Sequence, residues 1–254
     1  MFVEKIKAVF SEEPQFDGPI LVEGLPGVGN VGKLAAEHLL DQLKAKKFAD
    51  IYSSYFPPQV VVDEEGVTKL VNNEIYYSKA DGKHPDLIIL VGDYQGLTPE
   101  GQYDLSDHML QLCKGWGVRT IFTLGGYGIG KMVEHPRVLG AATSKTLVEE
   151  MKTKGVIFSK GEPGSGIVGA SGLLLGLGKV YGMDAVCLMG ETSGYFVDPK
   201  GAEAVLRVLA AILNVEIDFS DLESKAEQID LITSKLKEIE NPAEPRREDL
   251  GYIG

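Results

Sequence analysis

The order of apolar and polar segments along the chain predicts strands that alternate with helices. Apolar residues recur at three and four positions over residues 31–43, the period of an amphipathic helix, and further helical stretches follow at 101–114 and 202–213. Apolar runs that suit strands stand at 19–23, 87–91, 118–124 and 185–189. Strands separated by helices of this length predict an α/β fold with a mostly parallel sheet flanked by helices.

Two further segments extend this pattern. Residues 60–63 and 67–71 bracket an Asp-Glu-Glu-Gly turn, which predicts a hairpin. The most apolar run, 167–180, contains Lys179 and four glycines and is shorter than the ~20 residues that a membrane span needs. We therefore expect a buried, glycine-rich helix packed on the sheet, and no membrane partner.

The C-terminal region differs from the rest of the chain, and we divide the protein into an α/β domain (1–216), a C-terminal helix (217–240) and a flexible tail (241–254). Two prolines, Pro242 and Pro245, end the helix. Its apolar positions follow a seven-residue pattern that fits either a short coiled-coil seam for oligomerisation or docking, or a surface helix packed on its own domain. They are Leu222, Ile229, Ile232, Leu236 and Ile239.

Composition and charge exclude several classes of protein. A hydrophobic share of 44% in 254 residues is that of a folded chain. With 25 Lys and Arg against 37 Asp and Glu, the net charge of -12 argues against a nucleic-acid partner, because phosphate backbones are bound by clustered cations. Cys113 and Cys187 have no CxxC spacing, and the N-terminus lacks a signal-peptide core. These features predict a reduced, cytoplasmic protein.

The glycine cluster after the first strand is compatible with several functions. Gly27, Gly29 and Gly32 satisfy G-x-G-x-x-G between a strand and a helix, as in dinucleotide-binding turns, although Asp50 precedes the next predicted strand (51–53) instead of ending it. Gly27 to Lys33 also match a P-loop, but Leu34 replaces its Ser or Thr. The alternatives are a dinucleotide site, a nucleotide hydrolase, another anion site, or a turn whose glycines only allow close packing.

Two carboxylates lie where open α/β sheets bind ligands, at the carboxyl ends of strands. Asp93 follows one apolar run and Glu191 another, so they define a candidate ligand pocket with Gly27, Gly29, Gly32 and Lys33. Glu191 and the residues after it could instead cap a helix. We find no catalytic constellation and no metal-ligand spacing among the four His, and we predict no catalytic residues, no metal and no cofactor.

The sequence also resembles the proteasome assembly chaperone 2 family, particularly its archaeal members. The resemblance spans about residues 18–215 and rests first on Glu23 to Lys33, continuing into Leu34, Ala35 and Ala36. Further matching segments are Pro57-Pro58-Gln59, Gly92-Asp93-Tyr94-Gln95, Leu124-Gly125-Gly126-Tyr127 and Leu188-Met189-Gly190-Glu191-Thr192. The resemblance implies that Leu34 is ordinary for the family and that the P-loop and dinucleotide matches are coincidental.

The resemblance implies a fold similar to purine nucleoside phosphorylases without their activity, self-association, and binding to α-subunits of the 20S proteasome. Some relatives bind the α-ring through a C-terminal hydrophobic-Tyr-any tripeptide. Here Tyr252 is third from the end and follows Gly251, so the tail departs from that motif. We expect Leu250, Tyr252, Ile253 and Gly254 to contact the partner in a shifted register or on another surface. The alternative is a ligase-like enzyme that binds a nucleotide or anion through Gly27–Lys33.

Overall fold

A mixed eight-stranded sheet forms the centre of the molecule, in the order β1-β3-β6-β7-β2-β8-β10-β9. The computed structural model describes residues 4–159, 161 and 166–240. Strands β7, β2, β8 and β10 are parallel neighbours, and the pairs outside them are antiparallel. The strands are β1 (Ile6–Phe10), β2 (Ile20–Gly24), β3 (Lys46–Ser53), β6 (Asn73–Ser78), β7 (Leu87–Gly92), β8 (Thr120–Gly128), β9 (Val138–Ala142) and β10 (Asp184–Thr192).

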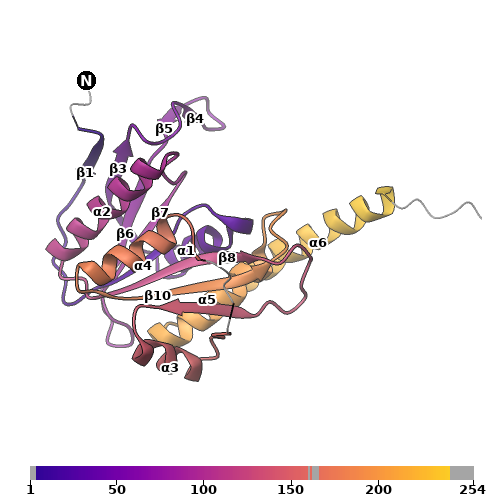
Figure 1. Cartoon of the computed structure of the whole chain (residues 1–254). Coiled ribbons are helices and arrows are strands. Elements are labelled where there is room, and N and C mark those ends of the chain that lie inside the picture. Colours follow the sequence, from indigo (N-terminus) through magenta and orange to yellow (C-terminus); the bar gives the residue numbers. More distant parts are fainter. Residues whose placement is uncertain (1–3, 160, 162–165, 241–254) are drawn as a thin grey trace, which may run out of the picture.

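Helices cover both faces of this sheet, which confirms the predicted α/β class (Figure 1). Helices α1 (Val31–Gln42), α3 (Lys145–Thr153) and α5 (Pro199–Leu213) pack on one face. Helices α2 (Pro99–Gly115) and α4 (Ala170–Val180) pack on the other. Within the described ranges, no helix is both long and apolar enough to cross a bilayer.

The central strands are apolar throughout because each contributes to two cores. Successive side chains of a strand point to opposite faces. In β7, Leu87, Ile89 and Val91 pack under α1 and α5, whereas Ile88 and Leu90 pack under α2 and α4. This double burial explains why 87–91 reads as a continuous apolar run.

Short polar side chains fix where the helices begin. The Thr98 hydroxyl accepts a hydrogen bond from Gly101 N at 3.0 Å, directly before Pro99 at the first position of α2. The Asp198 carboxylate accepts one from Gly201 N at 2.9 Å, before Pro199 in α5. Both helices therefore start at the carboxyl edge of the sheet.

Several sequence predictions are confirmed and others need correction. The apolar segment 167–180 does contain a partly buried helix, α4, and the predicted hairpin forms as β4 (Val60–Val62) and β5 (Thr68–Leu70). Asp50 does not precede a strand: it lies within β3, where its carboxylate accepts hydrogen bonds from Lys47 and Asn72. Three strands and one helix, β1, β6, β9 and α3, were not predicted.

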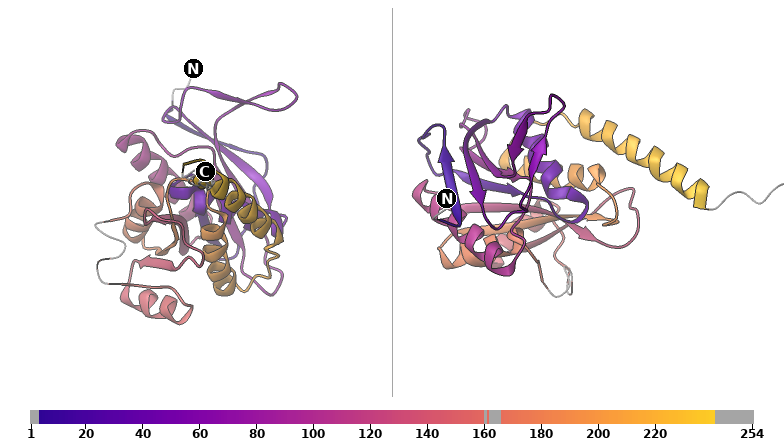
Figure 2. Two further views of the ribbon diagram at one scale, coloured as in Figure 1. Left: turned by 90° about the vertical axis from the view of Figure 1, so that its right-hand side faces the viewer. Right: turned by 90° about the horizontal axis from the view of Figure 1, so that it is seen from above.

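The C-terminal helix α6 (Ser220–Glu240) begins on the body and then projects away from it (Figure 2). Leu222 is buried in the core beneath α5, and Ala226 is also buried. One turn further along, Leu231 and Ile232 are 60% and 55% exposed. At 1.5 Å per residue the helix is about 30 Å long, so its C-terminal end lies well away from the body.

Candidate functional site at the carboxyl edge of the sheet

The glycine turn between β2 and α1 brings three backbone segments into close contact. A Cβ atom on Gly24 would lie 2.3 Å from the Cβ of Ala36, and one on Gly32 would lie 2.1 Å from the carbonyl oxygen of Leu124 in β8. Gly29 has a φ of 61°, in the left-handed region, and rests against Thr192. The local geometry thus requires glycine for packing at Gly24, Gly29 and Gly32.

Gly27 differs from the other glycines of the turn. Its backbone is extended, with φ -159°, and the atom nearest to an added Cβ would be Gln95 Nε2 at 4.0 Å. The Gln95 amide donates to Pro26 O at 2.7 Å and accepts from Ala170 N at 2.9 Å. It therefore fastens the turn to the first residue of α4.

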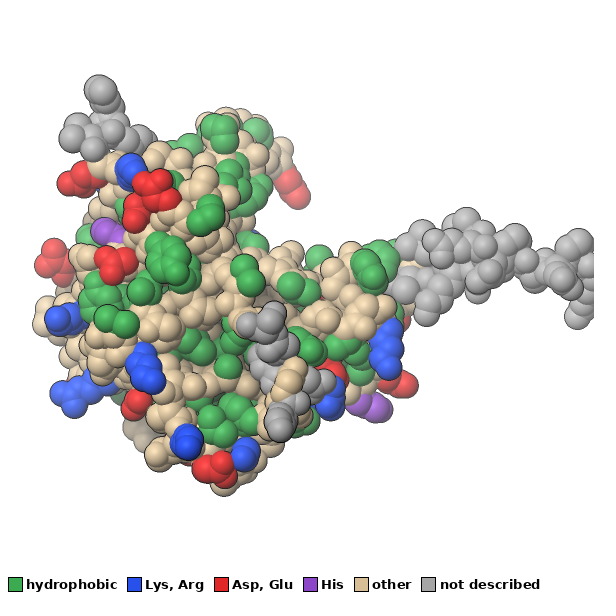
Figure 3. Space-filling view, in the orientation of Figure 1, with side chains coloured by type: hydrophobic (Ala, Val, Ile, Leu, Met, Phe, Trp, Pro, Cys, Tyr) green, Lys and Arg blue, Asp and Glu red, His purple; other side chains and the backbone are tan. Residues whose placement is uncertain are grey.

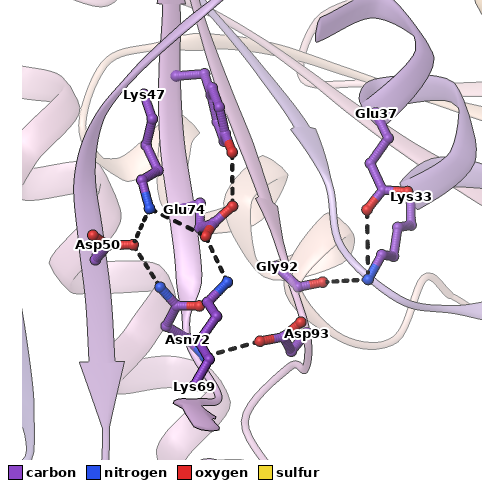
Figure 4. A network of polar contacts seen from close by, with 10 residues as sticks. Lys33, Glu37, Lys47, Asp50, Lys69, Asn72, Glu74, Gly92 and Asp93 are labelled. Carbon is purple, nitrogen blue, oxygen red and sulfur yellow. Dashed lines mark hydrogen bonds and ion pairs between the residues drawn. The ribbon is translucent and has the colours of Figure 1, made fainter. Parts of the chain in front are cut away.

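Lys33, the residue that would contact phosphate in a P-loop, points to the end of β7 (Figure 4). Its Nζ donates to Gly92 O at 3.0 Å and lies 3.6 Å from the Glu37 carboxylate. Asp93, next along the chain, accepts a hydrogen bond from Asn72 N at 3.2 Å. Lys33 and Asp93 thus lie on either side of the end of β7, each with an intramolecular partner.

Glu191 lies on β10, two strands away from β2 in the sheet, and has its own cationic partner. Its side chain is 5% exposed and accepts from Arg137 N at 3.0 Å and Arg137 Nε at 2.8 Å, with a third, short contact to Arg137 Nη2. The Arg137 guanidinium holds the pKa of this carboxyl below its usual range. The helix-capping alternative for this residue is wrong, because β10 continues through Thr192 and Asp198 caps α5.

Glu23 is a buried carboxyl that sequence reasoning did not single out. It is the penultimate residue of β2 and is 0% exposed, and its two oxygens accept hydrogen bonds from Leu25 N and Ser171 Oγ, both at 3.0 Å. Burial raises its pKa to about 7, and the hydrogen bonds from Leu25 N and Ser171 Oγ, which lower the pKa, offset only part of this effect. Ser171 belongs to α4, so Glu23 also ties this helix to the glycine turn.

The same edge carries an exposed apolar surface. Val28, at the tip of the glycine turn, is 47% exposed, and its Cγ1 lies 3.5 Å from where a Cβ on Gly194 would be. The next residues, Tyr195, Phe196 and Val197, are 75%, 43% and 43% exposed. Apolar side chains gathered in this way are typical of surfaces that contact other proteins.

We predict that Lys33→Ala weakens folding slightly and changes no ligand binding. Losing the hydrogen bond to Gly92 O and the Glu37 contact should lower the free energy of unfolding by about 0.5–1.5 kcal/mol. Isothermal titration with ATP, NAD and inorganic phosphate should give the same trace for wild type, Lys33→Ala and the stem-preserving control Lys33→Met. Binding by wild type that both variants lose would instead support the phosphate-loop alternative.

The predicted tail residues Leu250, Tyr252, Ile253 and Gly254 lie outside the described residues. Over the part of the chain that the structure describes, no group of three or more His, Cys, Asp or Glu is arranged to hold a metal ion. Cys113 and Cys187 are free, buried thiols, and burial raises the pKa of Cys187 to about 12. Both thiols lie in the hydrophobic core between the sheet and helices α2 and α4, and not at the carboxyl edge.

The fold and the carboxyl edge of the sheet together define an α/β protein with a tightly packed glycine turn and a projecting C-terminal helix. Residues 21–237 match the model of the PAC2 family. An uncharacterized protein of Methanocaldococcus jannaschii, MJ1210, is 39% identical over 100% of both chains. This chain belongs to the PAC2 family, which confirms the resemblance seen in the sequence.

Solved structures of Pyrococcus furiosus proteins resemble this chain throughout. PbaB, described as an archaeal proteasome activator, is 44% identical with a TM-score of 0.87, over 92% of this chain and 99% of PbaB. PbaA, described as an archaeal homolog of proteasome-assembly chaperone, is 26% identical with a TM-score of 0.77, over 94% of each chain. The predicted α/β architecture is therefore shared with structures of this family.

Proposed function

We propose that this protein is an ATP-independent assembly chaperone or adaptor of the proteasome, which binds α-subunits or the α-ring of the 20S particle. The observation that carries the proposal is the 44% identity to PbaB over nearly the whole of both chains. The two chains also share the fold over most of their length, with a TM-score of 0.87. The proposal includes self-association and a cytoplasmic location.

The geometry of the carboxyl edge supports a binding protein over an enzyme. The two candidate carboxylates are engaged, Glu191 by Arg137 and Asp93 by Asn72 N, and Lys33 is engaged by Gly92 and Glu37. Gly29 and Gly32 are in contact with Thr192 and Leu124, so two of the glycines that a phosphate would approach are covered by the protein itself. The exposed surface nearby is apolar, which suits a protein partner.

The C-terminal arm supports a role for the tail. Helix α6 leads away from the body, and residues 217–254 hold 10 acidic against 5 basic residues in the sequence. A segment with this excess of acidic residues is attracted to basic surfaces, which raises the rate of encounter with them. If several copies associate, their tails act together, and contacts that are weak singly combine into stable binding.

Sedimentation velocity tests the proposal directly. Full-length protein is mixed with 20S core particles and, separately, with free α-subunits, and cosedimentation is followed at increasing ionic strength. We expect a complex with at least one of the two that weakens as salt screens the acidic arm. Absence of a complex with both would contradict the proposal.

A further inference from the structure

The hairpin β4–β5 stands apart from the main sheet and exposes an apolar face. In its register Val60 pairs with Leu70 and Val62 with Thr68, so Val60, Val62 and Leu70 share one face. These side chains are 50%, 58% and 44% exposed. A two-stranded hairpin is marginally stable in water unless another element covers it. The hairpin projects at the top of the molecule, where Figure 3 shows a group of hydrophobic side chains.

An apolar hollow lies beside the root of this hairpin, between the N-terminal ends of α2 and α4. Its volume is about 470 Å³, and its apolar lining includes Leu97, Pro99, Tyr103, Ile167, Val168 and Leu173. Leu97, Tyr103 and Val168 are 62%, 56% and 95% exposed. The Thr98 hydroxyl and the Gln102 amide nitrogen in the lining are hydrogen-bonded to Gly101 N and Gly96 O. The hollow therefore presents mainly apolar contacts to an occupant.

The hairpin and the hollow belong to one side of the molecule. Leu97 N donates to Tyr55 O at 3.0 Å, and the Gln59 amide donates to the Tyr94 hydroxyl at 2.6 Å. These bonds fix the strand leading into the hairpin against the segment that begins the hollow. A projecting apolar face and an apolar recess are thus held next to each other by the same short stretch of chain.

We propose that two copies of this chain associate by exchanging these elements, the hairpin of each copy seated in the hollow of the other. A two-fold contact uses the same patch on both subunits, so each copy must carry both the projection and the recess on one side. The six apolar side chains that would meet are each at least 44% exposed, and a standard interface covers ~800 Å² per partner, so the contact needs both elements of each copy. A small molecule in the hollow would leave the hairpin uncovered.

This inference rests on the self-association included in the proposed function and assigns it a surface. Proteasome binding does not enter its test, which uses the purified full-length chain alone. In the first measurement, the single variants Val62→Cys and Leu97→Cys are mixed and oxidised to form disulfide cross-links. One of the two chains carries an affinity tag, so that the two chains differ in size. The native thiols Cys113 and Cys187 are buried and do not interfere.

We expect a disulfide-linked heterodimer between the Val62→Cys and Leu97→Cys chains. Val61→Cys is the matched control, because Val61 is 45% exposed on the same strand but faces the opposite side of the hairpin. It should cross-link to Leu97→Cys at least tenfold less. Equal yields from the two positions, or no heterodimer, would overturn the inference.

The second measurement is the subunit count from light scattering at graded concentrations. Val62→Glu and Leu97→Glu should each shift the protein to a smaller assembly and raise the dissociation constant at least about tenfold, whereas Val61→Glu should leave it unchanged. A wild type that is monomeric throughout, or an unchanged assembly in Val62→Glu, would overturn the inference. If Val62→Glu and Leu97→Glu still cosediment with α-subunits, binding to the proteasome does not depend on this contact between copies.

Discussion

Replacing Gly32 by alanine is expected to lower the free energy of unfolding by about 3 kcal/mol. An added Cβ would lie 2.1 Å from the Leu124 carbonyl oxygen, which belongs to the central strand β8 and cannot yield without moving the sheet. This loss of stability is expected even though Gly32 lies in α1 and alanine is more favourable than glycine in a helix by ~1 kcal/mol. Denaturant unfolding of both proteins gives the difference.

Gly27→Ala is the matched control in the same turn. Gly27 is extended and has space around its Cα, so alanine should change stability by less than about 1 kcal/mol. If both substitutions were equally harmless, the close packing of α1 on β8 would be contradicted. If Gly27→Ala left folding intact but removed nucleotide or phosphate binding, the turn would be a ligand site.

Glu23→Gln is expected to make the protein more stable at pH 8 and to leave its stability at pH 4 nearly unchanged. The Glu23 carboxyl has a pKa of about 7 in the folded protein, against an ordinary value of 4.5. Between pH 4.5 and pH 7 the folded state therefore keeps a proton that the unfolded state has released. Its contribution to stability is therefore present at low pH and is lost as pH rises to 7. The full effect is about 3 kcal/mol at most.

Glutamine can keep the contacts of the protonated acid. Its oxygen can accept from Leu25 N, and its amide can donate to Ser171 Oγ, which also lies 3.5 Å from Leu124 O. Thermal unfolding of wild type and Glu23→Gln from pH 4 to 8 measures the difference, and comparison with wild type cancels every other titrating group. A constant difference over this range would show that the Glu23 carboxyl has the same pKa in the folded and unfolded states, which would contradict the raised value.

The sequence predicted the centre of the sheet because β7, β2, β8 and β10 carry apolar runs that alternate with helices. It missed the flanks, whose local pattern is weak. Strand β1 has three exposed residues out of five, and β9 consists largely of small residues. Helix α3 has nine residues and buries only Met151 fully. These elements are defined by their neighbours, and periodicity alone does not reveal them.

At the carboxyl edge, the sequence located Asp93, Glu191 and the glycine turn but could not pair them with their partners. Arg137 is 54 residues from Glu191, and Ser171 is 148 residues from Glu23. Such contacts depend on the order of strands and not on spacing along the chain. The role of Gly24, Gly29 and Gly32 in packing likewise follows from distances to Ala36, Thr192 and Leu124, which no motif records.

The most direct test of proteasome binding is native mass spectrometry with and without residues 250–254, which follow helix α6 in the sequence. Full-length protein and the deletion are each mixed with 20S core and with free α-subunits. We predict a complex for the full-length chain that the deletion loses, with Tyr252→Ala weakening it in the same direction. A complex that survives deletion would place the contact on the body or α6, and no complex with either form would contradict the proposed function.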